Sequence, residues 1–344
     1  AVVDGEYLVE SWGPVLQCMS QLARLRLTAS GLDSDESFLM VENPKKTASG
    51  RQEIQPITLF RQTAKAELAK EAEENNGKAV LEAVQEVLID KVFSSTVNLS
   101  AKSLAQFVEQ LIVVASTEVE GTSKSAITGV DTPKVATETT ATGSGISIFS
   151  LQRLVDVADH NMDVRPRLVW AQVWELMSDF FVNVACHDNN MVSLFAIDSL
   201  KQLSLKFLEK PELSEFNFQS SFLKPFLTVM QNDGSREVTR ELVLQCIDNI
   251  VRTKARNLRS GWKIVFSMLT IAANDFSENI EYLGLAILQR LLDDHQDEIE
   301  CLSPGKDSQV DAMSPLDRRN RNAYADDFVH LCRASLAFVQ TDGS

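Results

Sequence analysis

The chain has 344 residues, with 33 Lys and Arg against 48 Asp and Glu, which gives a formal net charge of -15 at pH 7. This acidic balance argues against nucleic acid as the main partner, because phosphate-dominated binding needs a surplus of basic residues. A hydrophobic share of 44% with 24% charged residues is typical of globular proteins. The chain can therefore bury a sizeable core.

No run approaches the roughly 18 to 20 apolar residues that a bilayer crossing needs. The chain opens without a basic segment leading into an apolar one, and we expect it to be a segment of a longer protein. The cysteines are odd in number, far apart and without a C-x-x-C pair, which favours reduced thiols and a cytoplasmic location. They are Cys18, Cys186, Cys246, Cys301 and Cys332.

Apolar residues recur with helical period over most of the chain, and no strand-type alternation extends beyond a few residues. Between 192 and 208 two apolar stripes coexist, which predicts a helix covered from both sides, as in stacked layers. The clearest single stripe runs through nearly three turns after residue 260, and a second one precedes it. The first stripe is Trp262, Val265, Phe266, Leu269, Ala272 and Ala273, and the second is Val243, Cys246, Ile247 and Ile250.

Three prolines, Pro14, Pro166 and Pro225, stand close ahead of apolar periodic runs and predict helix starts. Helix pairs then recur at roughly 40 to 47 residues, the spacing of HEAT and armadillo repeats. The predicted fold is all-α, an armadillo/HEAT-like α-α superhelix with long polar loops. A non-repetitive helical bundle remains an alternative, because the repeats share no internal sequence identity.

Polar segments interrupt the helical pattern and suggest the domain organisation. Residues 120–145 hold seven threonines and no aromatic residue, and such a composition cannot bury enough apolar surface to offset ordering entropy. We therefore predict an N-terminal helical part over 1–119, a disordered connector over 120–145, and a helical-repeat array over 146–344. Pro304, Gly305 and Pro315 predict a loop near 303–322 within this array.

The common catalytic and phosphate-binding motifs are absent from the sequence, and we assign no catalytic, cofactor-binding or metal-ligating residue. Cys186 and His187 are neighbours, but adjacent side chains rarely converge on one atom, so a buried thiol beside a solvent-facing imidazole is the preferred interpretation. The acidic run over 293–300 lacks the glycine-centred calcium loop and is interpreted as a solvated helix end.

One local cluster runs against the overall charge: five basic residues within twelve positions and no acid among them. We name it the basic corner; it consists of Arg252, Lys254, Arg256, Arg259 and Lys263. The cluster is either a solvated turn or a contact for anionic lipid or an acidic protein surface, worth roughly 1 kcal/mol per basic residue near a charged membrane. Trp262 lies inside the cluster, but its place in the apolar stripe favours core packing.

Several stretches resemble a known family. They are FAIDSLKQLSLKFLEKPELSEFNFQSSFLKPF at 195–226, NLRSGWKIVFSML at 257–269, WGPVLQCMSQLARLRLTASGLD at 12–33 and ISIFSLQRLVDVADHNM at 146–162. They resemble the large Arf guanine nucleotide exchange factors of the trans-Golgi, of the BIG and Sec-seven type. The resemblance covers nearly the whole chain, and by position it corresponds to the first homology region downstream of the catalytic exchange domain.

The resemblance implies a regulatory function on an all-helical, armadillo-like body. The catalytic glutamate of the family has no counterpart here, so we expect that this chain is a regulatory fragment that does not exchange nucleotide by itself. By position, the catalytic domain would precede residues 1–119 in the parent protein. The implied partners are a GTP-loaded Arf GTPase, an anionic trans-Golgi membrane surface, and other regions of the parent exchange factor. Binding the GTPase would recruit the enzyme and relieve its autoinhibition. The alternatives are a module that binds lipid directly and a structural or dimerisation scaffold.

Overall fold

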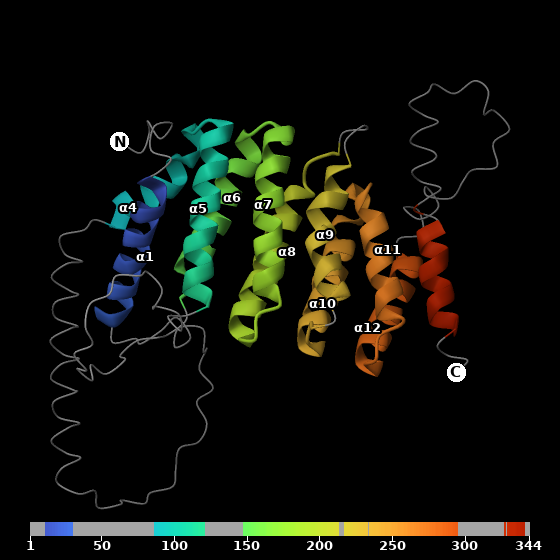
Figure 1. Ribbon diagram of the computed structural model, residues 1–344. Coiled ribbons are helices and arrows are strands. Elements are labelled where there is room, and N and C mark those ends of the chain that lie inside the picture. The colour runs from blue at the N-terminus through green and yellow to red at the C-terminus, as the bar shows by residue number, and fades with distance from the viewer. Residues whose placement is uncertain are drawn as a thin grey trace, which may run out of the picture. The chain divides into compact units, whose positions relative to one another are not determined.

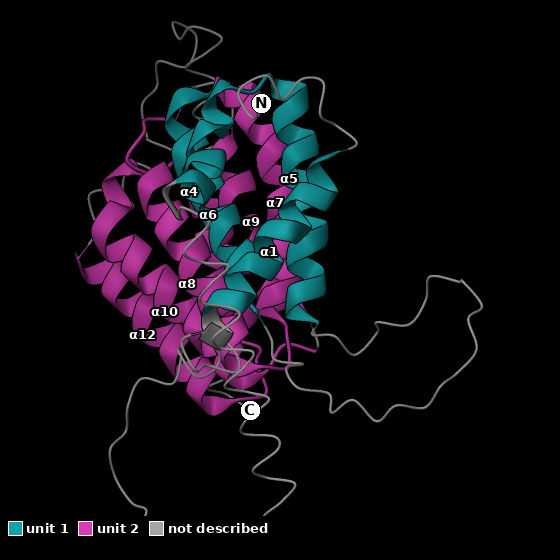
Figure 2. Ribbon diagram, turned by 90° about the vertical axis from the view of Figure 1, so that its left-hand side faces the viewer, with its two compact units in different colours: residues 1–165 teal, residues 166–344 magenta. Residues whose placement is uncertain are grey.

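The computed structural model describes residues 11–29, 86–120, 147–212, 217–232, 234–294, 327 and 329–340. Every regular element within these ranges is a helix, which confirms the all-α prediction. No helix among them is long and apolar enough to cross a membrane. The chain divides into two compact units, residues 1–165 and residues 166–344, which have different colours in Figure 2.

The first unit is organised around its longest helix, α5, which packs against α1 and α6. An aromatic cluster fills the space between these helices: Trp12 meets Phe107 edge to face at 5.0 Å, and Phe93 lies 6.2 Å from Phe107 and from Phe149. The elements are α1 (Trp12–Ala29), α4 (Glu86–Ser94), the 3-10 helix η3 (Ser95–Asn98), α5 (Ala101–Val119) and α6 (Phe149–Val164).

Polar side chains at the end of α6 hold η3 in place. Asn161 is fully buried, and its Nδ2 donates to Thr96 Oγ1 at 2.9 Å. The Arg165 guanidinium donates to the carbonyls of Thr96 and Val97 at 2.8 and 3.0 Å. Burial lowers the pKa of Arg165, but its guanidinium donates to the Val97 carbonyl and is a second donor to the Thr96 carbonyl, which also accepts from Leu99 N at 3.1 Å.

Glu118, in the last turn of α5, caps the start of α6. Its carboxylate accepts from Ser150 N at 2.8 Å and from Ser150 Oγ at 2.6 Å, and its carbonyl accepts from Ser147 N at 3.3 Å. A negative charge at a helix N-terminus is favourable because of the helix dipole. These contacts and Phe149 place α6 in the first unit, whereas the sequence grouped residues 146–164 with the later helices.

The second unit consists of two layers of stacked helices. In one layer α9 packs between α7 and α11, and in the other α10 packs between α8 and α12; Figure 1 shows α7, α9 and α11 in this order. The elements are α7 (Arg167–Ala185), α8 (Asn190–Phe207), α9 (Phe218–Gln231), α10 (Glu237–Lys254), η5 (Ala255–Asn257), α11 (Gly261–Ala272) and α12 (Glu278–Asp294), and residues 329–340 are also helical. The repeat-like superhelix is thereby confirmed.

The predicted stripes form the core of this unit. Helix α8 is covered by α7 on one side and α10 on the other, as its two apolar faces predicted. Stacked aromatic rings join the layers, with Phe222 lying 3.8 Å from Trp174 and 4.5 Å from Phe207 between ring centroids. All residues of the two stripes before and after residue 255 are buried.

Pro225 does not mark a helix start, and that prediction was wrong. It lies inside α9, which begins seven residues earlier at Phe218. Proline lacks the N–H that would bond the carbonyl of Ser221, but Ser221 is exposed, so water can satisfy this carbonyl. The start of α9 is fixed instead by contacts with a distant loop, which are described below. Pro14 and Pro166 do lie at helix starts. Residues 121–146 and 303–322 lie outside the described residues, so the predicted connector and loop stay predictions.

A close approach near the C-terminal end of the chain requires glycine. A Cβ at Gly284 of α12 would lie 2.8 Å from Ala272 Cβ and 3.0 Å from Phe338 Cζ. Both distances are shorter than ordinary van der Waals contact. The absence of a side chain at position 284 therefore lets α11 and the helix over 329–340 both pack tightly on α12.

We predict that Trp262→Ala destabilises the second unit by about 3 to 5 kcal/mol, because removing a large buried aromatic ring leaves a cavity. Trp262 is 2% exposed and stacks on Phe266 with ring centroids 5.4 Å apart. Urea unfolding followed by circular dichroism measures the change. The control is Tyr282→Ala, which removes a side chain that is 75% exposed and should cost less than about 1 kcal/mol. A Trp262→Ala variant as stable as the unaltered chain would contradict the buried role.

Candidate functional site

The five residues of the basic corner follow the chain through the connection between α10 and α11. Arg252 and Lys254 end α10, Arg256 lies in η5, Arg259 lies in the following loop, and Lys263 is in the first turn of α11. Positive charges in the last turn of α10 are favourable because they face the negative end of its dipole. The connection is thus the basic segment that the sequence predicted.

The structure divides these residues by their accessibility. The Lys254 ammonium lies 3.0 Å from Glu209 and its side chain is only 21% exposed, so its charge is largely compensated. The Arg252 side chain is 62% exposed and approaches Asp248 at 3.7 Å, which is a weak surface contact. Arg256, Arg259 and Lys263 are exposed as well. Four of the five side chains therefore remain at the surface.

A glutamate from the preceding inter-helix loop fixes the backbone of the corner. Glu212 lies between α8 and α9, and one of its carboxylate oxygens accepts from Ser260 N at 2.9 Å. The other oxygen accepts from Ser260 Oγ at 2.6 Å and from Gln219 N at 2.9 Å. A single carboxylate thus joins the start of α9 to the residue that precedes α11.

Gln219 extends this set of contacts, which we call the Glu212 network. Its side chain is 1% exposed, its Oε1 accepts from Arg259 N at 2.7 Å, and its Nε2 donates to Asn257 O at 2.9 Å. Asn257 Nδ2 donates to Leu208 O at 2.8 Å, and Ser220 N donates to Ser260 Oγ at 3.0 Å. The two loops are therefore held together by side chains that satisfy backbone groups.

The network limits what the corner can bind. The N–H groups of Gln219, Ser220 and Ser260 already have acceptors, and the Glu212 carboxylate lies beside the start of α11. A phosphate group would meet a negative charge there instead of free N–H donors. Contact with an anionic partner must therefore come from the long side chains, which suits a diffuse electrostatic surface better than a closed phosphate pocket.

The acids around the corner were not visible in its local sequence. Glu209, Glu212 and Asp248 all lie outside residues 252–263, and Glu212 is 48 positions from Ser260. Glu209 and Glu212 do belong to the family-like stretch at 195–226, but no spacing rule pairs them with a later turn. Such pairs are contacts between successive repeats, and they can be identified only once the three-dimensional fold is known.

The cysteine and histidine side chains give no sign of nucleophilic or metal chemistry in the described residues. Cys186 and His187 are both half-buried, rather than one buried and one facing solvent; burial raises the pKa of the Cys186 thiol, and His187 Nδ1 accepts from Asn189 N at 3.0 Å. Burial also raises the pKa of Cys246 to about 12. Both shifts favour the protonated thiol. Within the described ranges no group of three His, Cys, Asp or Glu residues could hold a metal ion.

A groove of about 630 Å³ runs between α7 and α9 of the second unit. Trp174 and Phe218 contribute aromatic surface to it, and Glu175, Asp179 and Lys224 contribute charge. The basic corner does not line it.

The part of the chain that carries the network matches a known family. Residues 206–290 match the family model described as Mon2/Sec7/BIG1-like, HDS. This range extends from the end of α8 into α12, so it contains the Glu212 network and every residue of the basic corner.

The wider chain is similar to large exchange proteins. Brefeldin A-inhibited guanine nucleotide-exchange protein 3 of Arabidopsis thaliana is 31% identical over 317 residues, covering 85% of this chain and 17% of the relative. The human protein of the same name numbered 1 is 32% identical over 320 residues, covering 88% of this chain and 16% of the relative. The chain thus spans about a sixth of the length of these curated relatives. The matches confirm the resemblance: the chain belongs to the family of BIG-type Arf guanine nucleotide exchange factors and corresponds to a downstream region of these proteins.

We predict that Glu212→Gln destabilises the second unit by about 2 kcal/mol, because hydrogen bonds to a charged acceptor are lost and an amide N–H₂ faces backbone donors. Thermal and urea unfolding measure the change. The matched control is Glu209→Gln, three residues earlier, whose carboxylate is 64% exposed and whose loss should cost less than about 1 kcal/mol. Equal effects of the two substitutions would contradict the structural role of Glu212.

Proposed function

We propose that this chain is a non-catalytic regulatory region of an Arf guanine nucleotide exchange factor that binds GTP-loaded Arf at the trans-Golgi membrane. Binding would recruit the parent enzyme and relieve its autoinhibition. The observation that carries the proposal is the similarity to BIG-type exchange proteins over most of the chain, together with the HDS match over residues 206–290. The function that this resemblance implies is regulation of an exchange domain elsewhere in the parent protein.

The basic corner supports a membrane-proximal location for the second unit. Arg252, Arg256, Arg259 and Lys263 are exposed on a connection whose backbone is fixed by the Glu212 network. Near an anionic bilayer each exposed basic residue contributes about 1 kcal/mol. The rest of the chain is acidic, so these side chains would orient the unit with this edge toward the lipid headgroups.

A second candidate function follows from the same exposure: direct binding to anionic lipid without a GTPase. Four exposed positive charges would contribute a few kcal/mol at most, which corresponds to weak and reversible membrane association. A requirement for GTP-loaded Arf separates the two functions.

We expect the chain to float with liposomes only when they carry lipidated, GTP-loaded Arf. The measurement is flotation on liposomes with anionic lipid, compared with the same liposomes carrying GDP-loaded Arf or no GTPase. Flotation that is independent of Arf would support the lipid-binding function instead. An absence of flotation in every arm would contradict both functions.

Reversing Arg252, Arg256 and Arg259 to Glu together should weaken this recruitment while leaving the melting temperature nearly unchanged, because exposed charges contribute little to stability. If the corner contacts anionic lipid, the loss should be greatest at low salt, since the screening length is about 8 Å near physiological ionic strength. If it contacts the GTPase, the loss should persist on neutral liposomes that carry GTP-loaded Arf.

The matched control reverses three exposed basic residues elsewhere, Lys91, Lys102 and Arg333, and gives the same change in net charge. It should reduce recruitment less than reversal of the corner. Equal recruitment by the two triple variants would remove the corner from the binding surface.

A further inference from the structure

Phe276 is more exposed than any other large hydrophobic side chain that the structure describes, at 105% of the reference area. It lies in the turn between α11 and α12, directly after Asp275 and before Ser277. This turn is at the opposite end of α11 from the basic corner. An aromatic side chain without contacts in its own protein buries no apolar area when the chain folds. It can bury that area only against a partner.

The turn that presents Phe276 is fixed on the side before it by an ion pair with α10. Arg240 Nε donates to Asp275 Oδ2 at 2.7 Å, and Arg240 Nη2 donates to Asp275 Oδ1 at 3.0 Å. The side chains of Arg240 and Asp275 are only 16% and 6% exposed. The backbone N–H of Asp275 also donates to Ala272 O at 3.2 Å. Two parallel bonds between a guanidinium and a carboxylate fix both position and orientation.

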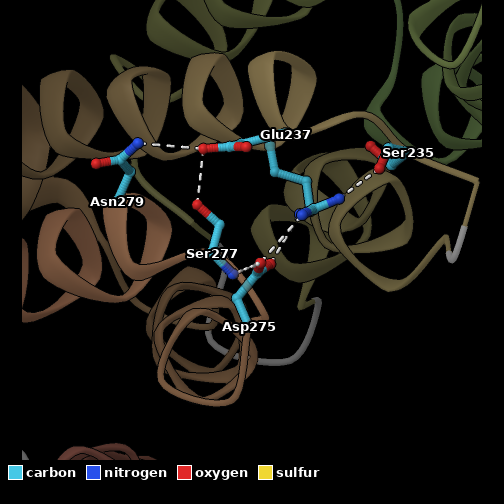
Figure 3. A network of polar contacts seen from close by, with 6 residues as sticks. Ser235, Glu237, Asp275, Ser277 and Asn279 are labelled. Atoms are coloured by element: carbon cyan, nitrogen blue, oxygen red, sulfur yellow. Dashed lines mark hydrogen bonds and ion pairs between the residues drawn. The ribbon is translucent and has the colours of Figure 1, made fainter.

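The side after Phe276 is fixed as well, as Figure 3 shows. Ser277 N donates to Asp275 Oδ1 at 3.0 Å, and Ser277 Oγ donates to Glu237 Oε1 at 2.7 Å. Asn279 Nδ2 donates to the same Glu237 oxygen at 3.2 Å. The backbone on both sides of Phe276 is therefore anchored to α10, and its aromatic ring is held out into solvent. A side chain displayed from a fixed backbone loses little conformational freedom when a partner binds it.

The charges around the turn restrict the kind of partner. Arg240 faces Asp275, and Arg236 donates to the carbonyls of His187 and Asp188 and to Asn190, so both arginines are directed toward the protein itself. The carboxylates of Glu237 and Glu278 are exposed.

Hydrogen bonds from Ser277 and then from Asn279 lower the pKa of Glu237, which favours its charged form at neutral pH. An acidic rim repels an anionic bilayer but suits a protein surface with an apolar pocket bordered by Lys or Arg.

We infer that this turn is the docking surface for the activated GTPase, with Phe276 as the anchor inserted into an apolar pocket on that partner. The inference rests on the proposed function. It places the contact with lipid at the basic corner and the contact with the GTPase at the Phe276 turn, which lie at opposite ends of α11. GTP-dependent binding requires a surface that forms only when γ-phosphate orders the switch segments of the GTPase. A fixed aromatic side chain distinguishes an ordered pocket from a disordered one, whereas diffuse charge does not.

The test uses the whole 344-residue chain and a soluble, non-lipidated Arf GTPase loaded with a non-hydrolysable GTP analogue, without any bilayer. Calorimetry measures the Kd. Phe276→Ala should raise the Kd by about tenfold or more, as expected for a central aromatic anchor, and Phe276→Leu should retain part of the affinity. The melting temperature should not change, because the ring is already in solvent. The control is Leu336→Ala, which removes another exposed apolar side chain, 58% exposed, and should leave the Kd unchanged.

The outcomes separate this inference from the proposed function. GTP-dependent binding that Phe276→Ala leaves unchanged overturns the inference and leaves the function standing. If the unaltered chain binds only the lipidated GTPase on liposomes, the same variants are compared there, and the same loss is expected. A loss of flotation on liposomes without GTPase would identify Phe276 as a lipid contact and overturn the inference. Failure of the unaltered chain to bind GTP-loaded Arf in either setting overturns both.

Discussion

The carboxylate of Glu212 joins successive repeats of the second unit, and the arrangement of the candidate site depends on it. Helix starts leave backbone N–H groups without partners, and a stack of helices must satisfy them at every inter-helix turn. Here Glu237 of α10 accepts from the side chains of Ser277 and Asn279 at the start of α12, and Glu212 accepts from the backbone N–H groups of Gln219 in α9 and of Ser260 before α11. Glu118 does the same for α6 in the first unit. Acidic side chains thus fix the positions of neighbouring helix ends relative to each other, and they also give the chain its negative net charge.

The twelve residues of α11 separate two edges of opposite character. At one end the connection from α10 displays Arg252, Arg256, Arg259 and Lys263; at the other end the turn to α12 displays Phe276 between exposed glutamates. At about 1.5 Å per residue the edges lie about 18 Å apart along the helix. Both are held by buried or half-buried polar contacts, so their separation changes little with side-chain motion. A rigid helix with two such ends suits the proposed arrangement, in which one end contacts a membrane and the other end contacts a protein.

The apolar patterns in the sequence correctly predicted those features that depend only on the residues within one helix. The stripe from Trp262 to Ala273 gave the buried face of α11, and the two stripes of α8 gave its position between α7 and α10, since both depend only on helical period. Pro225 was misassigned because the start of α9 is set by Glu212 and Ser260, and Ser260 is more than thirty positions away. For the same reason Lys254 appeared to be a surface charge, although Glu209 of the preceding repeat compensates it. The sequence does not single out Phe276, because the exposure of a side chain depends on the tertiary fold.

In the first unit, the hydrogen bonds between Glu118 and Ser150 hold the last turn of α5 next to the first turn of α6. These contacts add to the packing of α5 on α6 and hold the two helix ends together. Closing a longer segment across a fixed junction costs little additional entropy, because the cost grows only with the logarithm of length. This position is therefore a natural place for a domain insertion, and a foreign domain fused there would leave the two helices packed as they are.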